Sequence, residues 1–338
     1  MIYGLARRAL FSLDAETSHE LTLSLLARFP RLSTAPFRCA VPDDPVEKFG
    51  LHFRNRVGLA AGLDKNGDCL EAWDRLGFGF IEIGTVTPRP QPGNPKPRMF
   101  RLPDQQALIN RLGFNNKGVD YLVARVRETP IRAVLGINIG KNADTPLQHA
   151  ADDYELCLRK VYPHASYVTV NISSPNTKSL RDLQQTEALT SLLQRLMQTR
   201  VELEQRHGRR VPLLLKIAPD NDAAALREIA RVAREQHVDG LIATNTTVQR
   251  PGFDTDARAA EPGGLSGAPL KPLSLSALKI LRTALGADFP LIGVGGILSG
   301  SDAQERVEAG ADLVQVYTGF IYRGPAIVTE CRQSLMQS

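Results

Sequence analysis

The sequence is poor in cysteine and has no long apolar run. Its 338 residues include four cysteines, at positions 39, 69, 157 and 331, and none belongs to a C-x-x-C pair. This spacing indicates neither a zinc site nor a disulfide framework, so we expect a protein of the reducing cytosol. No apolar run approaches the roughly 20 residues that cross a bilayer, and the segment after Arg7 and Arg8 reaches Asp14 too early for a secretory signal. We therefore expect a chain that does not span the membrane but is free to lie on its surface.

The bulk composition excludes little else. Hydrophobic residues make up 43% and charged residues 23%, as in an ordinary soluble globular protein. The net charge of +5 comes from 41 basic and 36 acidic residues. Such a small excess is compatible with nucleic acid or an anionic membrane as partner but does not by itself indicate either.

Eight short apolar runs alternate with stretches of helical character from residue 56 onward. The runs lie at 56–62, 80–86, 133–140, 167–173, 211–219, 240–246, 290–296 and 313–319. Between them, segments such as 186–207 and 221–237 place apolar residues three and four apart, which is the period of a helix. The alternation predicts repeated βα units on a parallel sheet, and eight units predict an α/β fold of the (β/α)8 TIM-barrel type. A doubly wound open sheet is the alternative.

Two segments lie outside this repeat. Residues 87–112 form a proline-rich excursion of the length typical of a lid or binding loop. Residues 1–40 contain two short amphipathic helical patterns, so we expect an N-terminal helical segment over 1–40 and a barrel over 41–338. From composition alone, packing against the barrel is the simplest role for these helices.

Polar residues gather at the predicted carboxyl ends of the strands, where barrel enzymes carry out their chemistry. Any one of them could cap a helix or satisfy a turn. Their convergence on one end of all eight strands predicts an active site instead. In strand order they are Asp64, Lys65, Thr85, Asn138, Lys141, Asn171, Ser173, Ser174, Asn176, Lys216, Thr244, Asn245, Thr246, Gly295, Gly296, Tyr317 and Thr318.

The residue types at these ends narrow the chemistry. Glycine motifs at 263–267, 293–296 and 317–319 lie where such barrels commonly bind phosphate, although tight turns also select glycine. None of the six histidines falls at a strand end, which argues against a histidine-centred triad or a histidine-ligated metal. Sparse acidic residues argue against glycosidase-type carboxylate pairs. Asparagines and lysines suit a ligand with amide edges and a carboxylate or anionic ring. We expect a phosphorylated ligand and no metal.

Longer motifs carry a resemblance that covers nearly the whole chain. They include GLAAGLDKNG, LINRLGFNNKG, LGINIGKN, NISSPNT, LLLKIAPD, ATNTT, GGLSG, IGVGGI and QVYTGF. With these motifs the sequence resembles the membrane-associated, quinone-dependent dihydroorotate dehydrogenases, also called class 2. The resemblance implies an FMN-binding (β/α)8 barrel behind a small helical N-terminal domain. It also implies oxidation of (S)-dihydroorotate to orotate in pyrimidine (UMP) biosynthesis, with FMN as hydride acceptor and a membrane quinone as final electron acceptor.

The resemblance assigns expected roles residue by residue. For FMN it implies Ala61, Gly62, Leu63, Asp64, Lys65, Thr85, Asn138, Asn171, Lys216, Thr244, Gly267, Gly296, Tyr317 and Thr318. For the substrate it implies Lys65, Asn110, Arg111, Leu112, Gly113, Phe114, Asn171, Asn176, Asn245 and Thr246. For the quinone, His19 and Arg101 are candidate contacts.

Ser174 is implied as the catalytic base, which removes a proton from C5 while hydride leaves C6. A serine hydroxyl is a weak base at neutral pH, so it needs exact placement and a path for its own proton, such as Thr177 with a bound water. On the residues alone, Ser173 and Ser174 could instead cap the chain before Pro175. Soluble relatives usually have cysteine at this position and lack the N-terminal helices, whereas this chain has serine and has the helices.

The resemblance also implies the protein's surroundings. We expect peripheral attachment of residues 1–40 to the cytoplasmic face of the cell membrane, a monomer, and no nucleic-acid partner. Two alternatives stay open from the residues. Another FMN barrel, such as a tRNA dihydrouridine synthase, would suit the basic charge but uses cysteine for proton transfer and adds a C-terminal helical domain. A barrel that only binds a phosphorylated metabolite would leave Ser174 and Lys216 unexplained.

Overall fold

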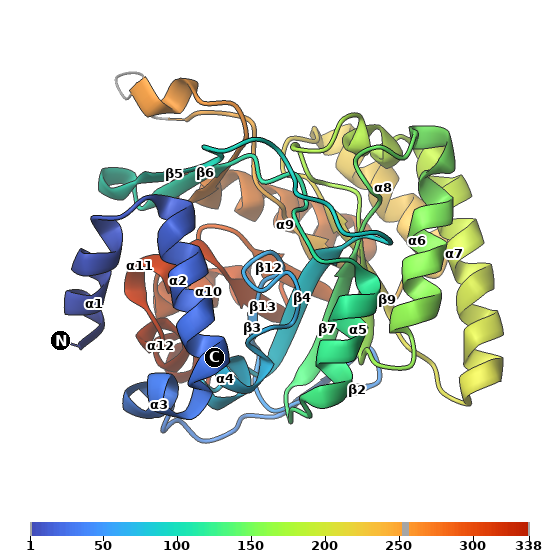
Figure 1. Ribbon diagram of the computed structural model, residues 1–338. Coiled ribbons are helices and arrows are strands. Elements are labelled where there is room, and N and C mark those ends of the chain that lie inside the picture. Colours follow the sequence, from blue (N-terminus) through green and yellow to red (C-terminus); the bar gives the residue numbers. More distant parts are fainter. Residues whose placement is uncertain (1, 252–256, 337–338) are drawn as a thin grey trace.

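The structure is a computed structural model that describes residues 2–251 and 257–336. At its centre is a closed barrel of eight parallel strands (Figure 1). The predicted TIM barrel is therefore confirmed, and the alternative of a doubly wound open sheet is wrong. Each of the eight predicted apolar runs contains one strand. Around the barrel these are β3 (Val57–Leu59), β4 (Phe80–Val86), β7 (Val134–Ile139), β8 (Tyr167–Asn171), β9 (Leu213–Ile217), β10 (Gly240–Ala243), β12 (Leu291–Val294) and β13 (Leu313–Val316), which pairs back with β3.

Helices form the outer layer and bury their apolar faces against the strands. The two helical segments predicted at 186–207 and 221–237 are confirmed as α7 (Thr186–His207) and α8 (Ala223–Glu235). In α7 the buried leucines recur at helical spacing. Short 3-10 helices occur at 35–37, 103–105, 147–149, 180–184, 257–260 and 268–270. The helices are α4 (Leu70–Arg75), α5 (Val119–Glu128), α6 (Ala150–Val161), α7 (Thr186–His207), α8 (Ala223–Glu235), α9 (Lys271–Leu285), α10 (Gly300–Glu308), α11 (Thr318–Arg323) and α12 (Ala326–Leu335).

A hairpin closes the amino end of the barrel. It consists of β1 (Val46–Lys48) and β2 (Leu51–Phe53). Phe53 is fully buried in one apolar cluster with Phe80 and Tyr167, which are the first residues of β4 and β8. The Phe53 and Phe80 rings meet edge to face with their centroids 5.4 Å apart. Because this end is plugged, a ligand site is left to the carboxyl end.

The proline-rich excursion forms part of a small antiparallel sheet above the carboxyl end of the barrel (Figure 1). It contributes β5 (Met99–Leu102) and β6 (Ala107–Asn110), and the third strand is β11 (Gly264–Gly267). Pairing of β11 with β6 sets Gly264 opposite Asn110. Two segments more than 150 residues apart in sequence therefore meet beside the barrel's open end.

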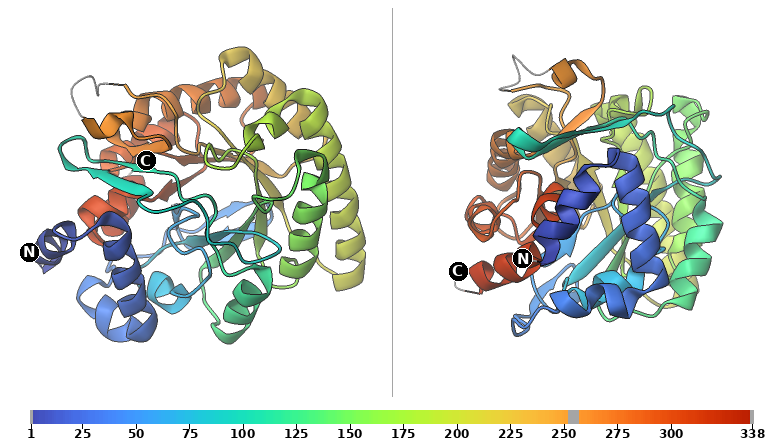
Figure 2. Two further views of the ribbon diagram at one scale, coloured as in Figure 1. Left: turned by 45° about the horizontal axis from the view of Figure 1, so that its top comes forward. Right: turned by 60° about the vertical axis from the view of Figure 1, so that its left-hand side comes forward.

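The N-terminal segment forms three helices, α1 (Ile2–Phe11), α2 (Ala15–Arg28) and α3 (Pro30–Thr34). They lie against one side of the barrel (Figure 2). The Asp14 side chain caps α2 by accepting from two backbone N–H groups. A buried ion pair between Glu16 and Arg98, 2.7 Å apart, joins α2 to the segment before β5. Among the described residues, no helix combines the length and apolarity that crossing a membrane requires.

Candidate active site

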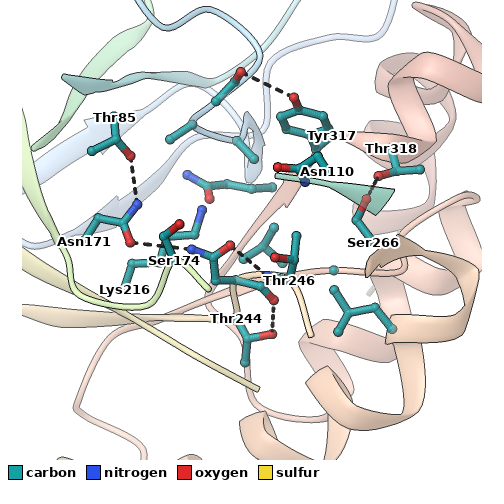
Figure 3. A pocket seen from close by; sticks show the side chains of 18 of the residues that line it. Thr85, Asn110, Asn171, Ser174, Lys216, Thr244, Thr246, Ser266, Tyr317 and Thr318 are labelled. Carbon is teal, nitrogen blue, oxygen red and sulfur yellow. Dashed lines mark hydrogen bonds between the residues drawn. The ribbon is translucent and has the colours of Figure 1, made fainter. Parts of the chain in front are cut away.

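A cavity with about 990 Å³ of empty space opens at the carboxyl end of the barrel. Its wall includes residues at or just after the ends of seven of the eight barrel strands, together with residues of β6 and β11. A lining that mixes apolar residues with a few amide, hydroxyl and ammonium groups is typical of a site for a cofactor and a small substrate. Figure 3 shows side chains from separate strands pointing toward this common space.

Most of the predicted site residues lie on this one cavity. Those that line it are Ala61, Gly62, Lys65, Thr85, Asn110, Leu112, Gly113, Phe114, Asn171, Ser174, Asn176, Lys216, Thr244, Asn245, Thr246, Gly267, Gly296, Tyr317 and Thr318. The predicted residues Leu63, Asp64, Arg111 and Asn138 are not part of its wall.

Three of these four have other contacts. Asp64 accepts from the backbone N–H groups of Asp68 and Cys69 and from the Trp73 indole, and burial raises the pKa of its carboxyl group. Arg111 forms an ion pair of 2.6 Å with Glu261 and stacks over the Phe100 ring. The Asp64 carboxylate is thus committed to protein donors, and the Arg111 guanidinium is held by Glu261 and Phe100.

Asn138 lies beneath the cavity and is fully buried inside the barrel. Its amide donates to Glu82, and its oxygen accepts from the Thr85 hydroxyl at 2.5 Å. Thr85 in turn accepts from Asn171 at 2.8 Å (Figure 3). Asn138 therefore supports two residues of the cavity wall.

Two buried lysines give the cavity its charge. The side chains of Lys65 and Lys216 line it, and the residues are 9% and 5% exposed. Within the described residues, neither ammonium group has a hydrogen bond or an ion pair. Burial lowers the pKa of Lys65 to about 8 and also lowers the pKa of Lys216. Since buried charges are costly unless paired, two unpaired ammonium groups favour an anionic ligand in this space.

Ser174 lies on the same wall, 5% exposed. Its Oγ accepts a hydrogen bond from the backbone N–H of Asn176 at 3.2 Å. The nearby Thr177 hydroxyl oxygen is buried without a partner among the described residues. Ser173, by contrast, donates its hydroxyl proton to Asn171 at 2.9 Å and faces a different set of partners. Of the two serines, only Ser174 lines the cavity.

Glycines form the wall near β12. Gly295 and Gly296 have φ angles of +110° and +73°, which side chains rarely adopt. A Cβ at Gly296 would lie 2.6 Å from Lys271 Cα, so the close packing against α9 also requires glycine there. Backbone shape and packing thus both account for the motif, and the N–H groups of this turn remain beside the cavity.

Two polar residues of the wall were not predicted. The Ser266 hydroxyl accepts from Thr318 at 2.9 Å, and Gln315 donates to the buried Glu82 at 2.8 Å. Ser266 belongs to the GGLSG motif. Its hydroxyl could have been predicted as a site residue, but the motif was interpreted only through its glycines. Gln315 is a polar residue within an otherwise apolar strand. This pattern could have predicted that its side chain points into the barrel.

A second cavity, of about 680 Å³, lies between the N-terminal helices and the barrel. His19 and Arg101 both line it, together with largely apolar side chains and Leu63. Burial, with a smaller contribution from Lys65, lowers the pKa of His19 to about 3, so the imidazole is neutral at physiological pH. Arg101 donates to the backbone carbonyl of Leu10 at the end of α1 and lies 4.6 Å from the centroid of the Phe11 ring.

Comparison with known proteins decides the family. Residues 45–338 match the family model described as dihydroorotate dehydrogenase. The chain belongs to the dihydroorotate dehydrogenase family. It is 55% identical over 344 residues to the dihydroorotate dehydrogenase (quinone) of Polaromonas naphthalenivorans, covering 99% of this chain and 98% of that one. The dihydroorotate dehydrogenase (quinone) of Aromatoleum aromaticum is 57% identical, covering 98% and 94%.

Solved structures of this dehydrogenase family have the same fold. A crystal structure of the Eimeria tenella enzyme in complex with ferulenol is 39% identical, has a TM-score of 0.87, and covers 96% of this chain and 91% of that one. The ligand-free form of the Eimeria tenella enzyme gives a TM-score of 0.86. The predicted family and enzyme class are confirmed, and the tRNA-modifying and purely binding alternatives lose their support. Among the described residues, no group of three or more His, Cys, Asp or Glu side chains could hold a metal ion.

Proposed function

We propose that the chain oxidises (S)-dihydroorotate to orotate with bound FMN and passes the electrons to a membrane quinone. The observation that carries this proposal is the pair of buried, unpaired ammonium groups of Lys65 and Lys216 on one cavity wall, beside Ser174. One anionic ligand would leave one of the two charges uncompensated. A carboxylate substrate would compensate one charge, and a flavin ring would compensate the other when it is reduced.

The cavity fits FMN in its donor set. FMN, when bound, accepts a hydride from the substrate and later releases the electrons to the quinone. Thr85, Asn171 and Thr244 would offer amide and hydroxyl groups to its ring, and the turn at Gly295 and Gly296 would offer N–H groups to its phosphate. The remaining expected FMN contacts are Ala61, Gly62, Leu63, Asp64, Lys65, Asn138, Gly267, Tyr317 and Thr318, of which Asn138 would act from beneath the cavity and Asp64 through its backbone.

Lys216 would hold the negative charge that the flavin ring gains on reduction. Its Nζ has no other partner among the described residues, and burial in a low-dielectric site strengthens such an interaction. Burial lowers the pKa of Lys216, and an anionic partner would raise it again.

The substrate would lie against Lys65 and the asparagines. Lys65 would pair with the carboxylate, while Asn110, Asn176 and Asn245 would donate to and accept from the amide-like ring edges. Thr246 and the segment Asn110–Phe114 complete this side, with Arg111 contributing through its backbone.

Ser174 would remove the C5 proton. Its Oγ accepts one N–H bond and is free to face a ligand in the cavity. The buried, unpartnered Thr177 oxygen supports the expected path for the serine proton, because a bound water there would satisfy it. A positioned general base typically contributes about 10² to 10⁴ in rate.

The quinone would occupy the second cavity. Its apolar lining suits an isoprenoid tail, and neutral His19 with charged Arg101 would bind the quinone head. Six of the eleven large apolar side chains that are clearly exposed in the described residues lie in the first 40 residues: Leu5, Leu13, Leu21, Leu25, Phe29 and Leu32. This concentration of exposed apolar side chains supports docking of residues 1–40 on a membrane surface.

An anaerobic titration tests the proposal. The purified protein should be yellow; dihydroorotate should bleach the flavin, and a quinone should restore the colour. A colourless protein that binds no FMN would contradict it, as would a flavin that dihydroorotate leaves oxidised.

A further inference from the structure

Arg181 is a partly buried residue outside both cavities, and its guanidinium contacts three loops at the carboxyl end of the barrel. It belongs to the 3-10 helix at 180–184. Nε donates to the Ser173 carbonyl at 3.1 Å, in the loop after β8, and Nη2 donates to the Thr246 carbonyl at 2.9 Å, in the loop after β10. Nη1 forms an ion pair of 2.7 Å with Asp220, in the loop after β9. None of the expected roles uses this residue.

Two of the three contacts attach Arg181 to a fixed frame. Thr247 donates its backbone N–H to the Leu265 carbonyl on β11 at 3.1 Å and accepts from the Leu265 N–H at 2.7 Å. Because a trans peptide is planar, the first of these bonds also fixes the direction of the Thr246 carbonyl. Asp220 accepts from the Thr247 hydroxyl, so it is tied to the same loop. The guanidinium therefore meets two acceptors whose positions do not depend on it.

The third contact is different, because the peptide between Ser173 and Ser174 has no other hydrogen-bonded support. Among the described residues, the Ser173 carbonyl accepts only from Arg181, and the Ser174 N–H has no hydrogen-bond partner. The Ser173 N–H and hydroxyl both bond to Asn171, which fixes this residue up to its Cα but leaves rotation about its Cα–C bond open. That rotation decides where the next peptide points, and Arg181 holds it.

The direction of this peptide sets where the Ser174 side chain stands. Ser174 precedes Pro175, which restricts Ser174 mainly to extended backbone and removes most of its own freedom. The Asn176 N–H, 3.2 Å from Oγ, orients the hydroxyl about the Cα–Cβ bond but does not place the Cα atom. Loss of the Arg181 contact would therefore shift the Ser174 hydroxyl and leave Thr246 in place.

We propose that Arg181 is a positioning residue that holds the Ser174 hydroxyl within reach of the substrate carbon from which it takes a proton. The inference rests on the proposed function, in which Ser174 is the proton acceptor. A guanidinium suits this task because its nitrogens donate in one plane and in fixed directions. A lysine offers a single nitrogen, so it keeps a positive charge beside Asp220 but not all three contacts. Misplacement of a reacting group by about 1 Å can cost on the order of 10²-fold in rate.

Arg282 provides a matched control at the opposite end of the barrel. Its guanidinium donates to backbone carbonyls that include Gly310 at 2.9 Å and Phe289 at 2.8 Å, and it forms an ion pair of 2.8 Å with Asp312. These partners precede β12 and β13. The exposed fractions of the two arginine side chains are similar, 20% for Arg282 and 22% for Arg181. Arg282→Lys therefore removes the same kind of contacts without touching the site.

Arg181→Lys and Arg282→Lys are compared with the wild-type protein in FMN-loaded form. Stopped-flow absorbance measures anaerobic flavin reduction at saturating dihydroorotate, calorimetry measures orotate affinity, and reoxidation by a short-chain quinone is followed in the same samples. We expect Arg181→Lys to reduce its flavin roughly tenfold more slowly or worse, with orotate affinity within about threefold and quinone reoxidation within about twofold of wild type. Arg282→Lys should stay within about twofold of wild type in all three measurements.

An unchanged reduction rate in Arg181→Lys overturns the proposal, as does an equal slowing in Arg282→Lys. A loss of orotate affinity or of quinone reoxidation as large as the loss of reduction rate also overturns it, because Arg181 would then support the fold as a whole. If Arg181→Lys does not fold, Asp220→Asn decides. Slower flavin reduction with unchanged quinone reoxidation supports the role, whereas an unchanged rate or a failure to fold overturns it. A wild-type protein that binds no FMN, or whose flavin dihydroorotate does not reduce, refutes the proposed function instead.

Discussion

Orotate affinity should depend on pH through Lys65, whose side chain is buried on the cavity wall without a partner among the described residues. Burial lowers its pKa from 10.5 to about 8, which brings its titration into an accessible range. The sign follows from the charge. The ammonium form exists below this pKa and attracts a carboxylate, so affinity is full below about pH 8 and is lost as the pH rises through it.

The size of the effect follows from the protonated fraction. At pH 7 about nine-tenths of the free protein carries a charged Lys65, and at pH 9 about one-tenth does. Orotate binding should therefore weaken roughly tenfold between these two values, while a bound carboxylate holds the proton in the complex. Calorimetric titration of the FMN-loaded protein, at constant ionic strength from about pH 6.5 to about pH 9, measures this directly.

Lys65→Arg is the control because a guanidinium keeps its proton throughout the range. The orotate affinity of a folded, FMN-loaded Lys65→Arg protein should not change with pH. An affinity of the wild-type protein that does not change up to about pH 9 would refute the reasoning. A dependence that persists in Lys65→Arg would assign the titration to another group, with buried Lys216 the first to examine.

Two further predictions follow from the proposed function. Ser174→Ala should keep FMN but lose dihydroorotate oxidation by about 10²-fold or more, seen as slow anaerobic flavin reduction, and wild-type-like reduction would remove Ser174 from its role. Replacing exposed Leu5 and Leu32 by glutamine should weaken binding to lipid vesicles by roughly tenfold or more, because each leucine contributes about 1.5 to 3 kcal/mol when fully buried. Leu156→Gln on α6, across the barrel, should leave vesicle binding unchanged, and an equal loss there would contradict a dedicated N-terminal surface.

The barrel could be predicted because its strands are buried on both faces. Such strands read as continuous apolar runs, as in Leu291–Val294, and they need no long-range information to be recognised. The antiparallel sheet of β5, β6 and β11 could not be predicted this way. Its strands are four residues each, and the pairing joins segments more than 150 residues apart, so only the tertiary fold defines it.

The site could be predicted by position but not by side-chain direction. Residues at the strand ends do gather on one cavity, as with Lys65 and Lys216. Asp64 and Asn138 also stand at strand ends, yet one accepts three protein donors and the other supports the wall from beneath. Which group is committed to the protein and which is left for a ligand depends on neighbours that sequence spacing does not define.

The two cavities differ in the polarity of their linings. The barrel cavity holds two lysines and many amides, while the second cavity is largely apolar, with a neutral His19. Of the residues that the structure describes, none lines both cavities. On the proposed function, the anionic dihydroorotate and the apolar quinone would each bind in a cavity of matching polarity. The lowered pKa of His19 fits this division: a charged imidazole beside Lys65 would draw anionic substrate toward the quinone cavity, and burial keeps it neutral.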